Sequence, residues 1–182
     1  MENKKLSTQK VVLAGMMAAV MAVMSQIQFP LPSGVPVTMQ TFAMALAGYV
    51  LGWRYGLIST AVYILLGAVG VPVFAGFSGG IGFATSPAGG YIWGFLPMVA
   101  LCALGFEKKN YVWLGTFSIL GLAACHLLGV IQFSFVTGMG AKQAFFIASV
   151  PYLVKDVASL AGAYIAAKAV RAGLRSAGVQ MA

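Results

Sequence analysis

The sequence VVLAGMMAAVMAV occupies residues 11–23, contains no charged residue and directly follows Lys10. A run of this kind near the start of a chain is typical of a signal peptide or of a first transmembrane helix. Several equally apolar runs follow it along the 182 residues, which favours the transmembrane helix. The stretch therefore predicts the fold class, an all-α membrane protein.

Five further apolar runs, separated by proline, glycine or charge, complete a prediction of six transmembrane helices. The predicted spans are residues 11–28, 38–53, 56–71, 88–105, 111–133 and 146–170. The composition agrees, because only 8% of the residues are charged, whereas a soluble domain carries about 25%. Six spans leave no room for a separate soluble domain, so we expect residues 1–182 to form a single integral membrane domain.

The positions of the basic residues predict the orientation of the chain. With the N-terminus in the cytoplasm, nine of the eleven Lys and Arg residues fall on the cytoplasmic side, Lys142 falls outside and Lys155 lies within the sixth span. This distribution satisfies the positive-inside rule, which an odd number of spans would break. We therefore expect a multi-pass protein of the cell membrane with both termini in the cytoplasm. The net charge of +8 is explained by topology and not by nucleic-acid binding.

Residues 72–87, between the third and fourth predicted spans, are uncharged and rich in glycine. The glycines in or just before this stretch are Gly70, Gly76, Gly79, Gly80 and Gly82. Irregular backbone at membrane depth is tolerated where protein buries it or where it lines a cavity. We expect an irregular Gly-rich loop near the outer face that forms one wall of a pocket. Its aromatic residues Phe74, Phe77 and Phe83 fit either apolar pocket walls or interfacial anchors.

The sixth span carries two adjacent ionisable residues, Lys155 and Asp156. A charge at membrane depth is costly unless it is paired or faces a polar cavity, so both residues are candidates for ligand binding. A structural ion pair is the alternative. We favour ligand contact, because adjacent helical side chains point about 100° apart and make poor partners.

Other polar residues are predicted at the same outer level, where the second, fourth and sixth spans begin. They are Thr38, Gln40, Ser86, Tyr91 and Tyr152. The positive dipole ends of three helices would attract an external carboxylate to this region. His126 lies near the same depth, but no second metal ligand is near it, so we predict no metal site and interpret it as a structural residue that bonds a neighbouring helix.

The first span carries small residues at four-residue spacing: Ala14, Ala18 and Ala22. Such a stripe lets another helix approach closely. The spacing fits packing within the chain's own bundle and docking of a partner subunit equally well.

Two common sequence signatures of catalysis are absent. The chain has no GxxxxGK[ST] phosphate loop and no HExxH zinc site. We therefore expect neither an enzyme nor a cofactor, and any transport must be driven by another protein.

Three segments resemble the BioY family, the biotin-specific substrate-binding subunits (S components) of energy-coupling-factor transporters. They are Val35–Thr41 (VPVTMQT), Leu66–Gly76 (LGAVGVPVFAG) and Pro87–Tyr91 (PAGGY), the last followed by Gly94-Phe95. The family tends to show the pattern P-F-x-P-x-D-x-x-K in its last helix. The corresponding residues of this chain are Pro151–Ser159 (PYLVKDVAS). Asp156 matches the aspartate, but Ser159 replaces the lysine, and Lys155 precedes the acid.

This resemblance implies capture of biotin from outside, together with a transmembrane coupling subunit and two cytoplasmic ATPase subunits. It favours partner docking for the alanine stripe. It also implies that Gly89 and Gly90 bring backbone amides close to the ligand. The alternative function is a self-sufficient secondary transporter or facilitator of a small vitamin or related anion. A membrane-embedded enzyme would need a nucleophile with a base or a metal set, and the sequence offers neither.

Overall fold

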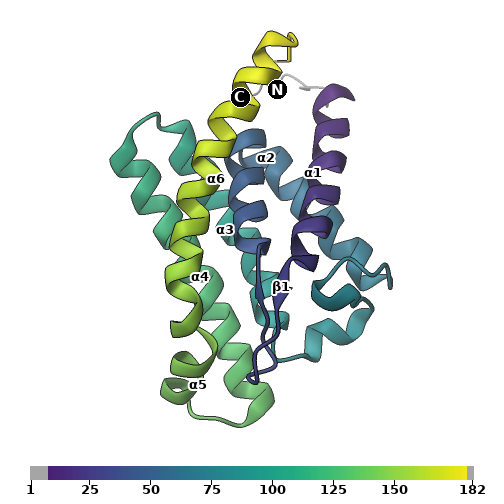
Figure 1. The fold of residues 1–182 in the computed structure, drawn as a ribbon, viewed down its shortest axis with the longest axis vertical. Helices are drawn as coiled ribbons and strands as arrows, with labels where there is room; N and C mark the ends of the chain where they lie inside the picture. Colours follow the sequence, from purple (N-terminus) through teal and green to yellow (C-terminus); the bar gives the residue numbers. More distant parts are fainter. Residues whose placement is uncertain (1–7, 180–182) are drawn as a thin grey trace, which may run out of the picture.

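The computed structural model describes residues 8–179, which are mostly helical (Figure 1). The elements in chain order are α1 (Thr8–Gln26), β1 (Gln28–Phe29), β2 (Val37–Thr38), α2 (Gln40–Ala68), η1 (Ala75–Phe77), η2 (Ile81–Thr85), α3 (Gly89–Glu107), α4 (Tyr111–Thr137), α5 (Ala141–Ala148) and α6 (Val150–Ser176). Within this part of the chain, α1, α2, α3, α4 and α6 are long and apolar enough to cross a membrane. The start of α1 and the end of α6 lie at one end of the bundle, and α5 lies at the other (Figure 1).

Helix α2 joins the second and third predicted spans and bends sharply at Gly52. The backbone there has φ 76° and ψ 174°, a conformation that is essentially restricted to glycine. In a straight helix Gln40 and Tyr63 would lie about 34 Å apart, yet Gln40 Nε2 donates a hydrogen bond of 2.7 Å to the Tyr63 hydroxyl. The two arms of α2 therefore fold back against each other. The described residues thus form five long apolar helices where the sequence predicted six, because a glycine bend replaces the expected loop.

The last predicted span begins and ends later than expected. Residues 141–148 form the separate short helix α5, and the chain turns at Ser149 before α6 begins at Val150. Pro151 lies in the first turn of α6, where its missing N–H costs no helical hydrogen bond. The break places Ser149 and the first turns of α6 beside α4.

Residues 69–88 contain no α-helix but are held in place by the end of α1. Ser25 Oγ donates to the Val73 carbonyl at 2.6 Å, and Gln26 Nε2 donates to the Phe74 carbonyl at 3.0 Å. Gln26 Oε1 also accepts from Phe77 N at 2.9 Å. Two short 3-10 helices, η1 and η2, form within this anchored segment.

Close approach of small residues sets the packing around α3, which lies between α2 and α4. A Cβ on Gly48 would lie 2.7 Å from the Val99 carbonyl, and one on Gly94 would lie 2.7 Å from Cys125 Cα. Helices in membranes use such positions to bring their backbones together. The close packing of α2, α3 and α4 therefore positions the site residues that these helices carry.

Candidate functional site

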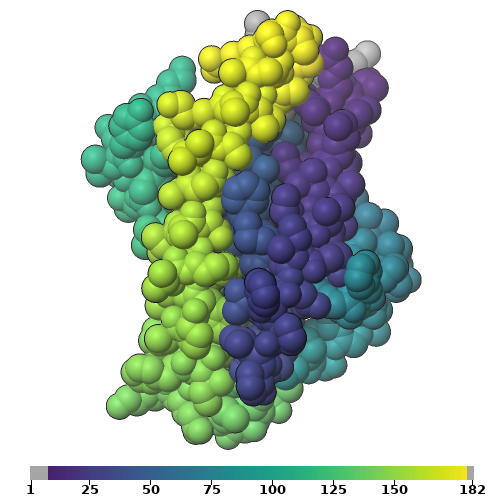
Figure 2. Space-filling model, viewed as in Figure 1, coloured from purple at the N-terminus to yellow at the C-terminus, as the bar shows by residue number. Residues whose placement is uncertain are grey.

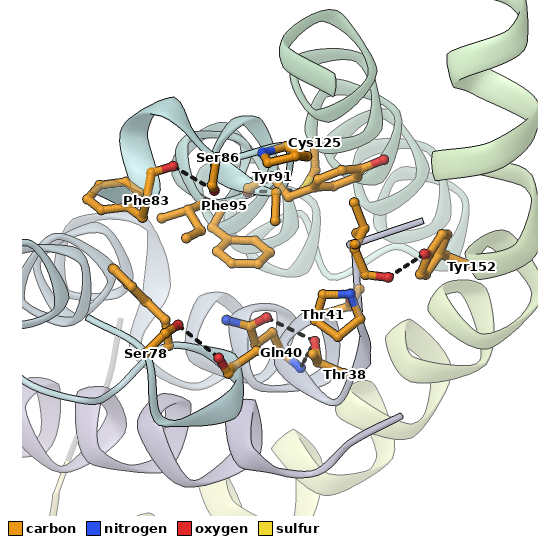
Figure 3. A pocket seen from close by; sticks show the side chains of 18 of the residues that line it. Thr38, Gln40, Thr41, Ser78, Phe83, Ser86, Tyr91, Phe95, Cys125 and Tyr152 are labelled. Carbon is orange, nitrogen blue, oxygen red and sulfur yellow. Dashed lines mark hydrogen bonds between the residues drawn. The ribbon is translucent and has the colours of Figure 1, made fainter. Parts of the chain in front are cut away.

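A cavity of about 410 Å³ lies among the N-terminal ends of α2, α3 and α6, the middle of α4 and residues 74–88. Figure 3 shows Thr38, Gln40 and Thr41 on one side, with Ser86, Tyr91, Phe95 and Cys125 facing them. The volume falls within the usual range for small-molecule sites, about 300–1,000 Å³. Seven of the residues predicted to bind a ligand line it: Thr38, Gln40, Ser86, Tyr91, Tyr152, Lys155 and Asp156.

The carboxylate of Asp156 is buried in the cavity wall, with 4% of the residue exposed. Its Oδ2 lies 3.1 Å from His126 Nε2, and His126 Nδ1 lies 2.9 Å from Ser149 Oγ. A neutral histidine with its proton on Nε2 satisfies both contacts, since Nδ1 then accepts from the serine hydroxyl. The imidazole therefore connects the acid on α6 to the turn before that helix.

Lys155 pairs with its neighbour Asp156, so the expectation that adjacent residues make poor partners is wrong. The reason is the length of the lysine side chain, whose four-carbon stem lets Nζ reach Asp156 Oδ1 although the two Cα–Cβ bonds diverge. Lys155 Nζ also donates to the Thr38 carbonyl at 2.8 Å. Both charged groups line the cavity, so the ion pair does not remove either of them from the candidate site.

The polar groups at the start of α2 are already oriented by one another. Thr38 Oγ1 donates to Gln40 Oε1 at 2.9 Å, and Gln40 Nε2 donates to the Tyr63 hydroxyl. An amide held at both ends presents its remaining N–H and lone pair in a fixed direction. A ligand would therefore meet a preformed polar edge here.

The Gly-rich stretch supplies apolar walls, through two of its three phenylalanines. Phe74 and Phe83 are buried, line the cavity and pack edge to face with ring centroids 4.9 Å apart. Phe77 is 71% exposed and is not among the lining residues, so only this phenylalanine retains the anchor interpretation. Phe95 and Leu122 extend the apolar surface from α3 and α4.

Two tyrosines close the side of the cavity nearest α5 and α6. Tyr152 donates a 2.6 Å hydrogen bond to the Val35 carbonyl and contacts Ser33 Oγ at 3.1 Å, which ties the loop before β2 to α6. Tyr91 donates to the Ala148 carbonyl, and its ring packs at right angles to the His126 ring. These contacts brace the walls that hold Asp156.

Gly89 and Gly90, predicted to bring backbone amides close to the ligand, are not among the residues that line the cavity. A Cβ on Gly89 would lie 2.2 Å from the Phe83 carbonyl, and one on Gly90 would lie 2.2 Å from the Leu128 carbonyl. These glycines let α3 approach η2 and α4 closely.

The alanine stripe of α1, predicted to dock a partner, packs largely within the chain's own bundle. Ala14 and Ala18 are each 2% exposed and are packed in the core of the chain beside α2, while Ala22 is half-buried. Ala14 and Ala18 contact neighbouring residues of the same chain through van der Waals packing. The exposed side of α1 carries Met16 and Val23 instead.

Sequence reasoning missed two residues that build the site. His126 was expected to bond a neighbouring helix, which the Asp156 contact confirms, but its place in the cavity wall was not expected. Gln132 donates to the Ala84 and Ser86 carbonyls at 2.8 Å and so fixes the entry to α3. A polar side chain within an apolar span was the available signal in both cases.

Comparison with known proteins yields consistent matches across the chain. The sequence model of the BioY family matches residues 1–176. A protein of Pyrococcus horikoshii named probable biotin transporter BioY is 36% identical over 163 residues, which cover 90% of this chain and 96% of the relative. Biotin transporter BioY of Thermotoga maritima is 36% identical over 153 residues, covering 84% and 89%. A 2.1 Å crystal structure of the S-component for biotin from an ECF-type ABC transporter matches with a TM-score of 0.81 and 23% identity over 94% of each chain, which shows the same fold.

Proposed function

This chain belongs to the BioY family, and on that premise we propose that it is the biotin-binding subunit of an ATP-driven energy-coupling-factor transporter. It captures biotin on the outer side of the cell membrane and catalyses no reaction. It uses no cofactor for this step.

The observation that carries the proposal is the buried Asp156 carboxylate in the wall of a cavity bounded by Phe74, Phe83 and Phe95. Biotin combines an apolar bicycle with a ureido group that has two N–H donors and one carbonyl. A carboxylate accepts hydrogen bonds only, and it does so strongly when it is charged. Asp156 therefore accepts from the ureido N–H groups while the phenylalanines contact the bicycle.

The other polar groups of the cavity serve the remaining oxygens of biotin. Lys155 Nζ lies beside Asp156 and offers a cation to the ureido carbonyl or to the tail carboxylate. Thr38, Gln40 and Ser86 line the same cavity and complete a polar rim. The N-terminal dipoles of α2, α3 and α6 favour an anionic tail in this region.

The same proposal covers the orientation of the chain. The two arms of α2 cross the membrane separately, so the single domain of residues 1–182 makes six passes. Both termini lie in the cytoplasm, because nine of the eleven basic residues then lie on that side. The Gly-rich loop and the cavity then lie near the outer face, where biotin enters.

Energy for import comes from partner proteins, a transmembrane coupling subunit and two cytoplasmic ATPases. The chain itself has no phosphate-binding loop. We therefore expect the purified chain to bind biotin with a dissociation constant below about 1 μM in the absence of ATP. Isothermal titration calorimetry with biotin checks this result.

Liposomes separate this function from the alternative of a self-sufficient transporter. Vesicles that contain only this chain should bind labelled biotin without accumulating it, whereas vesicles with the complete complex and internal ATP should accumulate it. Net uptake by the chain alone would favour the alternative and contradict the capture role.

His126 should influence biotin affinity through Asp156. Replacing His126 by phenylalanine keeps an aromatic ring but removes both hydrogen bonds, so Asp156 Oδ2 loses its 3.1 Å contact and Ser149 Oγ loses its 2.9 Å partner. A hydrogen bond to a charged group contributes about 1.5–3 kcal/mol, so the variant should bind biotin roughly tenfold more weakly by titration. Leu127→Phe is the matched control, because it places the same ring on the exposed side of α4. Equal affinity in the two variants would show that His126 does not support Asp156.

A further inference from the structure

A second cleft, of about 550 Å³, lies at the opposite end of the bundle from the Asp156 cavity. It is formed by the corner between α3 and α4 and by the last turns of α6. Figure 2 shows this face hollowed between the α3–α4 corner and the yellow C-terminal part of the chain. None of the residues proposed to bind biotin lines it.

The described lining is strongly basic. Lys109 comes from the α3–α4 corner, while Lys168, Arg171 and Arg175 come from successive turns of α6. The carboxylate in the same lining, Glu107, accepts a hydrogen bond from Trp53 N and so faces the α2 bend. The electrostatic potential inside the cleft therefore favours an anion.

Two of these cations are held in place by aromatic rings. The Arg171 guanidinium lies 4.6 Å from the centroid of Phe106 while its Nε donates to the Val50 carbonyl at 3.1 Å. Lys168 Nζ lies 5.7 Å from the centroid of Tyr164. Cations ordered in this way lose less conformational freedom when an anion binds.

The backbone at Lys109 turns the chain from α3 towards α4. Its φ is 51°, the left-handed conformation that is common just after the end of a helix, and Lys109 N donates to the Phe106 carbonyl at 3.2 Å. This turn places Lys109 at the corner, where it lines the cleft.

The surroundings of the cleft are those of a membrane interface. Tyr111, Val112 and Trp113 at the start of α4 are each at least half exposed beside it, and Ile165 on α6 is 69% exposed. Tyrosine and tryptophan concentrate at the level of lipid headgroups. An occupant with an anionic head and apolar chains would satisfy both the cations and these side chains.

We propose that this cleft binds the phosphodiester headgroup of one anionic phospholipid of the cytoplasmic leaflet, with its acyl chains along α4 and α6. Lys109, Lys168 and Arg175 contact the phosphate. Basic pockets at the cytoplasmic ends of transmembrane helices suit such headgroups. A lipid is favoured over an acidic segment of a partner protein because exposed apolar residues continue directly from the cleft along both helices.

Native mass spectrometry of the full chain in a neutral detergent tests this site, with phosphatidylglycerol and phosphatidylcholine of identical acyl chains as probes. We expect one phosphatidylglycerol to be retained about tenfold more than phosphatidylcholine. The double variant Lys168→Gln/Arg175→Gln should lose this preference, and the charge-conserving Lys168→Arg/Arg175→Lys should keep it. The matched control is Lys108→Gln/Lys142→Gln, which removes two basic residues that do not line the cleft and should retain the lipid.

Several outcomes would overturn the proposal. Equal retention of the two lipids by the unaltered chain would do so, and so would an equal loss in the control variant. Displacement of the lipid by millimolar inorganic phosphate would identify a free-phosphate site instead. Loss of the lipid when the coupling subunit is added would assign the cleft to a segment of that protein. Biotin titrations of the same samples report the distant cavity separately, so failure of the lipid site and failure of the biotin site are distinguishable.

Discussion

Replacing Asp156 by asparagine is expected to weaken biotin binding about 100-fold, because a charged acceptor contributes up to about 3 kcal/mol per hydrogen bond. The carboxylate has Lys155 at one oxygen and His126 at the other. Asparagine replaces one of these oxygens with an NH₂ group. This group is a hydrogen-bond donor and would face another donor, either the Lys155 ammonium or the His126 N–H, so that contact becomes unfavourable. The ureido N–H groups also lose a charged acceptor. Isothermal titration of the purified variant with biotin measures the effect.

Glu107→Gln is the matched control for this experiment. It makes the same chemical change at the other carboxylate among residues 8–179, which lies in the cleft at the far end of the bundle. Its affinity for biotin should equal that of the unaltered chain. If Asp156→Asn also binds biotin normally, Asp156 does not contact the ureido group and the proposed site is incorrect.

A biotin analogue without its carboxylate identifies the end of the ligand that meets α6. If Lys155 binds the tail carboxylate, Lys155→Ala and removal of that carboxylate should each weaken binding, and the two changes together should weaken it little further. Fully additive effects would place the tail elsewhere on the polar rim. Such a cycle isolates one pairwise contact from the rest of the cavity.

Replacing Gly90 by alanine should lower the stability of the folded chain. The added methyl carbon would lie 2.2 Å from the Leu128 carbonyl and 2.8 Å from Gln132 Cβ, so α3 and α4 must separate. Overpacking of this kind costs about 1–3 kcal/mol. At roughly 2–4 °C per kcal/mol for a chain of this size, the midpoint of thermal unfolding in detergent should fall by several degrees.

Gly115→Ala on α4 makes the same change where no atom lies within 4 Å of the new methyl group. Alanine is the better helix former by about 1 kcal/mol, so this control should be neutral or slightly stabilised. Equal unfolding midpoints for the two variants would show that the α3–α4 contact tolerates a side chain at Gly90.

The sequence by itself determined the membrane class and predicted which polar residues lie at one level with Asp156. Apolar runs identify the long helices because a helix in lipid must be apolar over about 20 residues. An acid within such a run has few tolerable environments, so Asp156 was recognisable as a functional candidate without coordinates. Counting along the spans also predicted that Thr38, Gln40, Ser86 and Tyr91 share one level with it, and all of them line one cavity with Asp156.

The tertiary structure decided which side chains face each other. Hydropathy gives a residue's depth along a helix, but it does not give the direction in which its side chain points or the helix that lies beside it. Lipid-facing and protein-facing positions are equally apolar in a membrane, so no amphipathic pattern marks the packed face. For this reason the Asp156–His126 contact across 30 residues, the burial of Ala14 and Ala18 and the fold-back of α2 at Gly52 follow only from the assembled bundle.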